Sequence, residues 1–264
     1  MNMRIHIPTL LPPVRLLAVL ALPLLLTPNA ALAQSGSFAV SQNGKPVGTA
    51  SFRLTLKPGG YESTSLVHVD MQGLKYALSK SEELSSSHDL THVQLSAVVN
   101  ASAVDIVARP DAGQLLMNTS ANGRTSAIRL ALHQRAVFLP DFDPGALQNL
   151  LTIAAANNNR DLWAIIPKQA GLIAPIQLAT WPDEHGTSKG SPIAVRHMVA
   201  TIAGAATDLF FDPDNQLLQA ELPQQGFALV RNGFVLKPPA KPLGPPTDPG
   251  QAPSTAPVQP SPQQ

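Results

Sequence analysis

Short stretches in which apolar and polar residues alternate fill most of the chain between residues 37 and 237, and turn residues separate them. Residues 52–56 follow this pattern, whose period of two is typical of a strand with one buried and one solvated face. Asn43 and Gly44 lie between two such stretches, and an Asn-Gly pair is a strong signal for a hairpin turn. The pattern predicts an antiparallel sheet with short turns between neighbouring strands. The predicted strand segments, some of them hairpins, are 38–56, 61–71, 93–110, 114–132, 136–141, 162–167, 170–181, 193–204, 207–212, 216–222, 226–232 and 234–237.

One segment, residues 142–159, departs from the alternation and predicts a helix at about 143–157. Asp143 suits the N-cap, where a carboxylate accepts backbone N–H groups, and Pro144 suits the first helical position. Apolar residues then recur at helical spacing and form one stripe, which needs a sheet to lie against because so short a helix is unstable alone. The stripe consists of Leu147, Leu150, Leu151, Ala154 and Ala155.

Together these elements predict a mainly β protein. Its main element is an antiparallel curved sheet, a half-barrel or open barrel, with one main α-helix in the concave face. A closed barrel is the second architecture that the pattern allows. This domain is expected to occupy residues 34–237, which is enough chain for one hydrophobic core.

Both ends of the chain differ from this domain. Residues 1–33 combine a basic start, an apolar core at 16–26 and small residues before Gln34, which is the pattern of a cleaved signal peptide. The apolar core is too short to span a bilayer, so no transmembrane anchor is expected. Ten of the 27 residues at 238–264 are proline, and this tail is predicted to be disordered. The expected location is the periplasm or the outside of a bacterial cell.

Composition narrows the classes of function. The chain has 18 Lys and Arg against 17 Asp and Glu and no basic run, which argues against nucleic acid as a partner. It has no Cys, so the exported fold is expected to depend on its core and not on disulfides. Neither a Gly-x-Ser-x-Gly motif nor a glycine-rich phosphate loop is present. We therefore expect no enzyme activity, no catalytic residue and no cofactor.

The acidic stretch at 212–215, Asp-Pro-Asp-Asn, raises the question of a calcium site. A calcium loop needs oxygen ligands at about every second position and a closing bidentate acid. Asp212 and Asp214 fit the first two positions, but residues 216–218 supply neither the glycine nor the acid that should follow. Proline after aspartate also has the chemistry of a turn. The stretch is therefore predicted to be a bend between two strands, with no metal.

Two further clusters carry residues capable of chemistry. His88 and His92 share one face if their segment is helical, and they could then bind zinc. No third ligand is evident, so a loop that enters a strand is the preferred interpretation. Asp183, Glu184 and His185 lie in a polar loop predicted at 183–191, where no partner that orients an acid–base pair is visible.

Large apolar residues in and around the predicted helix are the remaining candidates for a site. Such residues fill a core or line a cavity for a hydrophobic ligand, and the sequence leaves both interpretations open. The candidate ligand-binding residues are Phe138, Leu147, Leu150, Leu151, Trp163 and Trp181.

Three segments occur in an order that resembles a family of uncharacterised exported bacterial proteins with a LolA-like, lipoprotein-localisation domain. They are 38–52 (FAVSQNGKPVGTASF), 137–142 (VFLPDF) and 208–222 (DLFFDPDNQLLQAEL). The resemblance covers most of residues 38–236 and excludes the proline-rich tail. It implies a half-barrel or open barrel whose concave apolar face around the helix holds acyl chains or stays empty. It supports a binding or carrier role and lends nothing to catalysis.

The expected function is that of an exported, soluble, non-enzymatic envelope protein that binds or carries a hydrophobic, lipid-like ligand between the curved sheet and the helix. The alternative is a structural or protein-interaction module of the periplasm with a fully packed core. An open apolar cavity beside the helix favours the first function. A dry core without a cavity above about 300 Å³ favours the second.

Overall fold

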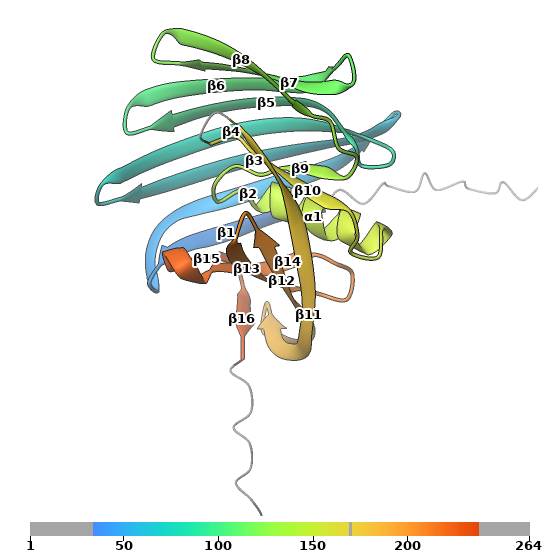
Figure 1. Ribbon diagram of the computed structural model, residues 1–264. Helices are drawn as coiled ribbons and strands as arrows, with labels where there is room; N and C mark the ends of the chain where they lie inside the picture. Colours follow the sequence, from blue (N-terminus) through green and yellow to red (C-terminus); the bar gives the residue numbers. More distant parts are fainter. Residues whose placement is uncertain (1–33, 169–170, 238–264) are drawn as a thin grey trace, which may run out of the picture. The chain divides into compact units, whose positions relative to one another are not determined.

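The computed structural model describes residues 34–168 and 171–237, and Figure 1 shows how their elements are arranged. The predicted signal peptide at 1–33 and the predicted disordered tail at 238–264 lie outside the described residues. Within the described ranges, no helix combines the length and the apolar character needed to cross a membrane.

One sheet of 16 strands dominates the described residues. The first eight strands are β1 (Gln34–Gln42), β2 (Lys45–Lys57), β3 (Gly60–Met71), β4 (Leu74–Ser85), β5 (Leu90–Val99), β6 (Ser102–Asp111), β7 (Gln114–Ala121) and β8 (Arg124–Ala131). The other eight are β9 (Ala136–Phe138), β10 (Leu162–Ile166), β11 (Leu172–Ser188), β12 (Ser191–Ile202), β13 (Ala205–Phe211), β14 (Leu217–Leu222), β15 (Phe227–Arg231) and β16 (Phe234–Leu236). A single α-helix, α1 (Pro144–Ala156), and one 3₁₀ turn, η1 (Pro223–Gln225), complete this part of the chain.

Two meanders meet at the middle of the sheet, where β1 pairs with β15. Strands β1 to β8 follow in order toward one edge, and β15 back to β9 follow toward the other, while β16 pairs with β11. Every pair is antiparallel except β9 and β10, which run parallel because α1 lies between them in the chain. The edge strands β8 and β9 do not pair with each other, so the described sheet is open. The predicted curved, mainly β fold with one main helix is confirmed.

Three local predictions were wrong. Strand β4 is absent from the predicted segments, because Lys80 and Glu82 occupy inward positions where apolar residues are expected. The segment 93–110 is two strands, β5 and β6, separated by a tight turn at Asn100 and Ala101. The polar loop predicted at 183–191 is mostly strand, because β11 continues to Ser188 past a bulge between Trp181 and Glu184.

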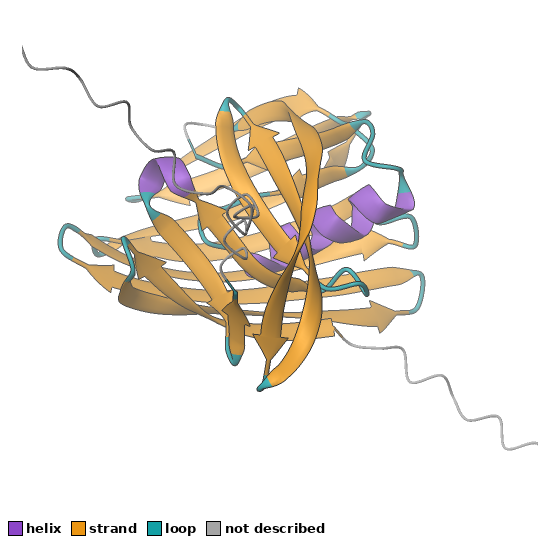
Figure 2. Cartoon of the chain, turned by 90° about the horizontal axis from the view of Figure 1, so that it is seen from below, coloured by secondary structure: helices purple, strands orange, loops and turns teal. Residues whose placement is uncertain are grey.

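Helix α1 forms where the sequence predicts it. The Oδ1 atom of Asp143 accepts the backbone N–H groups of Gly145 (2.8 Å) and Ala146 (3.2 Å), which satisfies two of the free donors at the helix start. The helix lies in the concave face of the sheet and contacts β2, β3, β9 and β14 (Figures 1 and 2). A side chain at Gly145 would collide with Ser65, so this glycine permits the close approach of α1 to β3.

A buried ion cluster joins the start of α1 to β4. The Nζ atom of Lys80 lies 2.6 Å from Asp143 Oδ2 and 2.9 Å from Glu82 Oε2, and all three side chains are inaccessible to solvent. Asn149 Nδ2 donates a hydrogen bond of 3.1 Å to Glu82 Oε2. Lys80, Glu82, Asp143 and Asn149 therefore form one network in which each carboxylate helps to offset the cost of burying the ammonium group.

The opposite flank of α1 is held by Gln148. Its Nε2 atom donates to the carbonyl of Asn215 (2.8 Å), and its Oε1 atom accepts the backbone N–H of Leu217 (2.9 Å). Asn215 belongs to the connection between β13 and β14, and Leu217 is the first residue of β14. The helix is thus hydrogen-bonded to β4 on one side and to the acidic bend on the other.

Replacing Lys80 by Met is expected to lower the free energy of unfolding by about 3–5 kcal/mol, because it leaves the Asp143 carboxylate buried without its cation. The matched control is Lys75→Met on the same strand, where the side chain is 77% exposed and pairs with Asp70 at the surface. That control is expected to change stability by less than about 1 kcal/mol. Denaturant unfolding at pH 7 measures both variants. Equal midpoints for the two variants would contradict a stabilising role for the cluster.

Candidate functional site

A cavity of about 150 Å³ opens beside the first turn of α1, and we name it the mouth cavity. Its walls come from residues 139–143, from the end of β10 and from β12 to β15. Its apolar lining residues include Leu139, Phe142, Leu147, Ile166, Ile202 and Leu229. The volume is below the usual range of small-molecule pockets. An apolar cavity of roughly 150 Å³ nevertheless accommodates a molecule the size of benzene.

The six candidate ligand-binding residues do not share one site. Phe138, Leu147, Leu150 and Leu151 are buried in the main core, and of these only Leu147 also lines the mouth cavity. Trp163 packs against the edge of the core and stacks on His133, with ring centroids 3.7 Å apart. Trp181 lies apart from them on β11 and is 54% exposed. Most of the predicted residues therefore fill the core.

Aromatic residues border the mouth cavity on the side of residues 139–142. Phe142 packs edge-on against Tyr76 and Phe227, with centroids 6.0 Å and 4.7 Å away. Its φ of 56° lies in the left-handed region, which is rare for a bulky side chain and stores strain. Lys168 and Asp141 form an ion pair at the rim and give the opening a polar border.

Burial is the largest cause of the pKa shifts of Tyr76 and Glu82 in this part of the structure. Burial, with the charges of Asp141 and Asp143, raises the pKa of Tyr76, so its phenol stays neutral and donates to the carbonyl of Asp141 (3.5 Å). Burial also raises the pKa of Glu82 above its ordinary value, against the opposing pull of Lys80. The Oε1 atom of Glu82 has no hydrogen-bond partner among the described residues, so it is the oxygen of this carboxyl group that is open to a proton.

The acidic stretch at 212–215 is the predicted bend between β13 and β14. Asp212 Oδ1 accepts the backbone N–H groups of Asp214 (3.0 Å) and Gln216 (2.8 Å), as in an Asx turn. Its carboxylate is therefore engaged in holding the turn. No group of three or more His, Cys, Asp or Glu within residues 34–168 and 171–237 has an arrangement that could hold a metal ion.

His88 and His92 lie where a loop enters a strand, as predicted. His88 precedes β5 and stacks on Tyr61 with centroids 4.3 Å apart, whereas His92 belongs to β5 itself. Burial lowers the pKa of His88, which favours the neutral ring. The two imidazoles therefore do not share a helical face.

Glu184 has a partner that the sequence does not reveal. His197 on β12 lies between two carboxylates, with Nδ1 3.2 Å from Glu184 and Nε2 2.9 Å from Asp208 on β13. Phe210 stacks on the imidazole at 4.3 Å. Both ring nitrogens are occupied, so neither is free to take a proton from a substrate. Only the pairing of β11, β12 and β13 brings these residues together.

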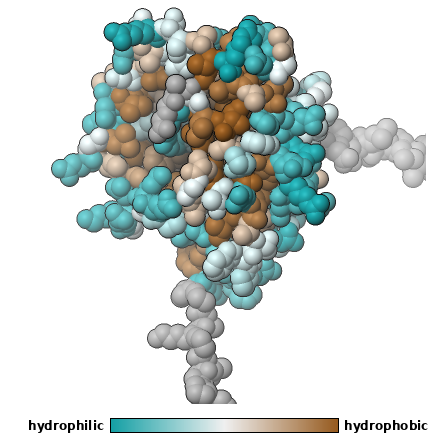
Figure 3. Space-filling view, in the orientation of Figure 1, coloured by the Kyte–Doolittle hydropathy of each residue, from teal (hydrophilic) through white to brown (hydrophobic). Residues whose placement is uncertain are grey.

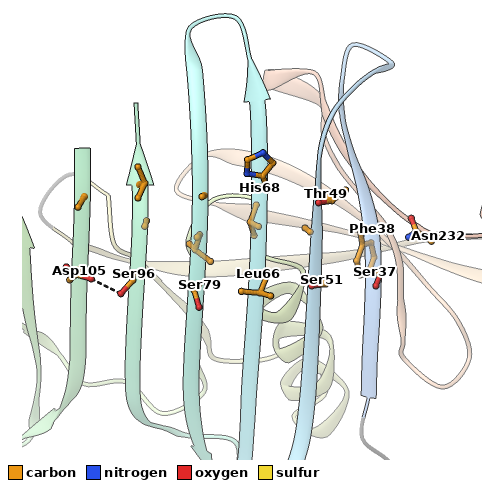
Figure 4. A pocket seen from close by; sticks show the side chains of 17 residues that line it. Ser37, Phe38, Thr49, Ser51, Leu66, His68, Ser79, Ser96, Asp105 and Asn232 are labelled. Carbon is orange, nitrogen blue, oxygen red and sulfur yellow. Dashed lines mark hydrogen bonds between the residues drawn. The ribbon is translucent and has the colours of Figure 1, made fainter. Parts of the chain in front are cut away.

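The face of the sheet opposite α1 carries a larger hollow, which we name the outer trough. It has a volume of about 730 Å³, within the range of ligand pockets, and it crosses strands β1 to β6 (Figure 4). Leu66 on β3 and Val98 on β5 line it and are 61% and 45% exposed. Ala77 and Ser79 of β4 lie between them, and their small side chains leave the space of the trough open. At the far end Ser96 donates a hydrogen bond of 2.6 Å to Asp105.

A second hollow of about 650 Å³ continues the trough past Leu66, and we name it the basic pocket. It shares Ser37, Ser51, Leu66 and Asn232 with the trough. Its lining contains three cations and no carboxylate: Arg53, Lys189 and Arg231. Neither hollow was predicted from the sequence, because the alternation of residues predicts which side chains point outward but not where neighbouring strands leave a hollow between them.

Apolar side chains also gather over β11 and neighbouring elements on the face seen in Figure 3. Leu172 at the start of β11 is among the exposed large apolar residues. Exposed apolar residues are common on protein surfaces, and this face defines no site by itself.

Comparison with protein-family models, with curated proteins and with solved structures finds no match to this chain. The resemblance to LolA-like exported proteins therefore stays a prediction.

Glu82→Gln is expected to flatten the dependence of stability on pH. Because the folded state raises the pKa of Glu82, the stabilising contribution of this group is fully present below its ordinary pKa and is lost as pH rises through the folded-state value. Gln mimics the protonated carboxyl at every pH. In the wild type, the free energy of unfolding falls by about 1.4 kcal/mol for each pH unit between the unfolded-state and the folded-state pKa of Glu82.

Denaturant unfolding between pH 4 and pH 8 measures this difference. The matched control is Glu83→Gln, which changes an exposed carboxylate on the outward face of the same strand. This control should follow the wild-type curve within about 0.5 kcal/mol. Parallel curves for wild type and Glu82→Gln would show that Glu82 has no raised pKa in the folded protein.

Proposed function

We propose that this protein is an exported, non-enzymatic envelope protein that binds or carries a hydrophobic, lipid-like ligand. The observation that carries the proposal is the mouth cavity beside the first turn of α1. Its lining is mainly apolar, and Lys168 and Asp141 lie at its border. An apolar end of the ligand enters the cavity, while a polar group stays at the rim.

The wall formed by residues 139–142 supports this proposal. Phe142 has a left-handed backbone, and strain of this kind persists in folded proteins mostly where function uses it. We expect movement of this segment to enlarge the cavity. The segment is held by the hydrogen bond from Leu139 N–H to the carbonyl of Ile165 and by the Asp141–Lys168 ion pair, and neither contact belongs to the buried ion cluster. A ligand longer than the cavity could then continue along the segment toward solvent.

The chemistry of the described residues supports a binding role over catalysis. His197, which lies between two carboxylates, has both ring nitrogens engaged. Asp212 is occupied by turn hydrogen bonds. Neither group has the free partner that general acid–base catalysis requires.

The tight packing around α1 supports the alternative function, a structural or protein-interaction module. Leu150, Leu151 and Ile153 are almost fully buried, and the mouth cavity is smaller than about 300 Å³. A module of this kind has no need for an apolar ligand. Binding of an uncharged apolar probe therefore distinguishes the two functions.

Filling the mouth cavity is expected to abolish binding of a neutral probe. Ala205 lines the cavity at the start of β13, so Ala205→Leu and Ala205→Phe place progressively larger side chains inside it. The probe is N-phenyl-1-naphthylamine, whose fluorescence rises in apolar surroundings. We expect its affinity to fall by about tenfold or more in Ala205→Phe, with an intermediate loss in Ala205→Leu.

The matched control is Ala179→Phe, which adds the same ring at an exposed position on β11. It should bind the probe as wild type does, and thermal unfolding confirms that each variant is folded. Equal probe binding by wild type and Ala205→Phe would refute the mouth cavity as the site. Absence of any probe binding to wild type would favour the interaction module.

A further inference from the structure

The outer trough and the basic pocket form one continuous path across the outer face of the sheet. They share Leu66, whose exposed side chain lies at the junction, and the face is the one opposite α1 (Figure 4). Six strands at spacings of about 4.8 Å make the path roughly 24 Å long. The path begins at the Ser96–Asp105 pair, continues along apolar surface at Val98 and Leu66, and ends at the positive charge of the basic pocket.

The turn between β15 and β16 holds the basic residues of the pocket near one another. The backbone N–H of Asn232 donates to the carbonyl of Ser37 on β1 (2.8 Å), and that of Lys189 donates to the carbonyl of Gly233 (2.7 Å). These bonds tie the turn between β11 and β12 to the first strands of the chain. Lys189 therefore reaches the same pocket as Arg53 of β2.

The three cations of the basic pocket differ in availability. Arg231 donates to the carbonyls of Leu217 and Ser35, so its guanidinium is engaged within the protein. Arg53 and Lys189 are exposed, and neither forms an ion pair with any described residue. Their positive charge is therefore free to pair with an anion from outside.

The apolar part of the path suits an alkyl chain better than a peptide. It lies on the face of the sheet, where the backbone groups of β1 to β6 are already paired along both sides of each strand. A peptide that crossed these strands would find no free ladder partners for its own backbone. An alkyl chain needs none, and it gains from covering Leu66 and Val98.

From this arrangement we propose that the outer face is a second binding site, independent of the mouth cavity, for an anionic amphiphile. The alkyl chain lies in the outer trough against Leu66 and Val98. The anionic head group, a phosphate or a carboxylate, binds Arg53 and Lys189 in the basic pocket. Guanidinium recognises such groups through paired N–H donors, and the nearby serine hydroxyls supply further hydrogen bonds.

Octyl phosphate, used below its micelle concentration, tests the proposal by isothermal titration calorimetry on the full chain. We expect 1:1 binding that weakens as salt rises, because the ion pairs lie at the surface. The double variant Arg53→Gln/Lys189→Gln is expected to weaken binding by about tenfold or more. Leu66→Asp is expected to weaken it similarly, because it puts a carboxylate in the path of the chain.

The matched control is Arg109→Gln/Arg124→Gln, which removes the same charge from exposed positions on β6 and β8. It should bind octyl phosphate as wild type does. Octyl glucoside and inorganic phosphate should each bind wild type at least about tenfold more weakly, because each supplies only half of the recognised chemistry. Equal affinity of the two double variants, or of octyl phosphate and octyl glucoside, would overturn the proposal.

Testing the variant of each site with the probe of the other site distinguishes the two sites. Ala205→Phe should keep its affinity for octyl phosphate, and Arg53→Gln/Lys189→Gln should keep its affinity for N-phenyl-1-naphthylamine. Loss of octyl phosphate binding in Ala205→Phe alone would place the amphiphile in the mouth cavity and refute the outer site. Binding of an acidic peptide without binding of octyl phosphate would also refute it and point to a protein partner.

Discussion

Burial of the Lys80 ammonium group is the constraint on which the rest of this structure depends. A charge in a protein interior is tolerated only where opposite charge and hydrogen-bond partners surround it. Glu82 supplies one partner from the same face of β4, two residues along the strand. Asp143 supplies the other from the start of α1. Because Asp143 also caps the helix, one side chain both defines where α1 begins and joins the start of the helix to β4.

Two further residues of the helix, Gln148 and Asn149, hold it on opposite sides. Asn149 reaches Glu82 on β4, and its neighbour Gln148 points the other way and bonds to the bend before β14. Neighbouring residues of a helix project in different directions, so rotation of α1 in either sense breaks one of these contacts. The helix is therefore a fixed wall of the core. On the concave side, the mouth cavity lies beside the first turn of this helix.

Features set by local chemistry were predictable from the sequence, and features set by distant partners were not. Asn43 and Gly44 adopt the left-handed backbone that their hairpin turn requires, with φ of 49° and 76°, and Asp143 caps α1 as its position predicts. Strand β4 was missed because Lys80 and Glu82 resemble solvated residues until Asp143 is placed beside them. Of the candidate ligand-binding residues only Leu147 lines the mouth cavity, because the order of β10 and β12 to β15 in the sheet decides its other walls. The outer trough lies on consecutive strands, and it depends on where small and large outward side chains fall side by side.

The contacts around the mouth cavity differ in strength, so its walls are expected to differ in how easily they move. On one side α1 is held by the buried ion pair between Asp143 and Lys80 and by the hydrogen bond that Asn149 donates to Glu82. On the other side the Tyr76 hydroxyl reaches the carbonyl of Asp141 only at 3.5 Å, a weak contact, and Phe142 is strained. Under the proposed function, we therefore expect a ligand that needs more than the existing space to displace residues 139–142 and to leave α1 in place. Relief of the strain at Phe142 offsets part of that cost, so the adaptable part of the site is the segment before the helix.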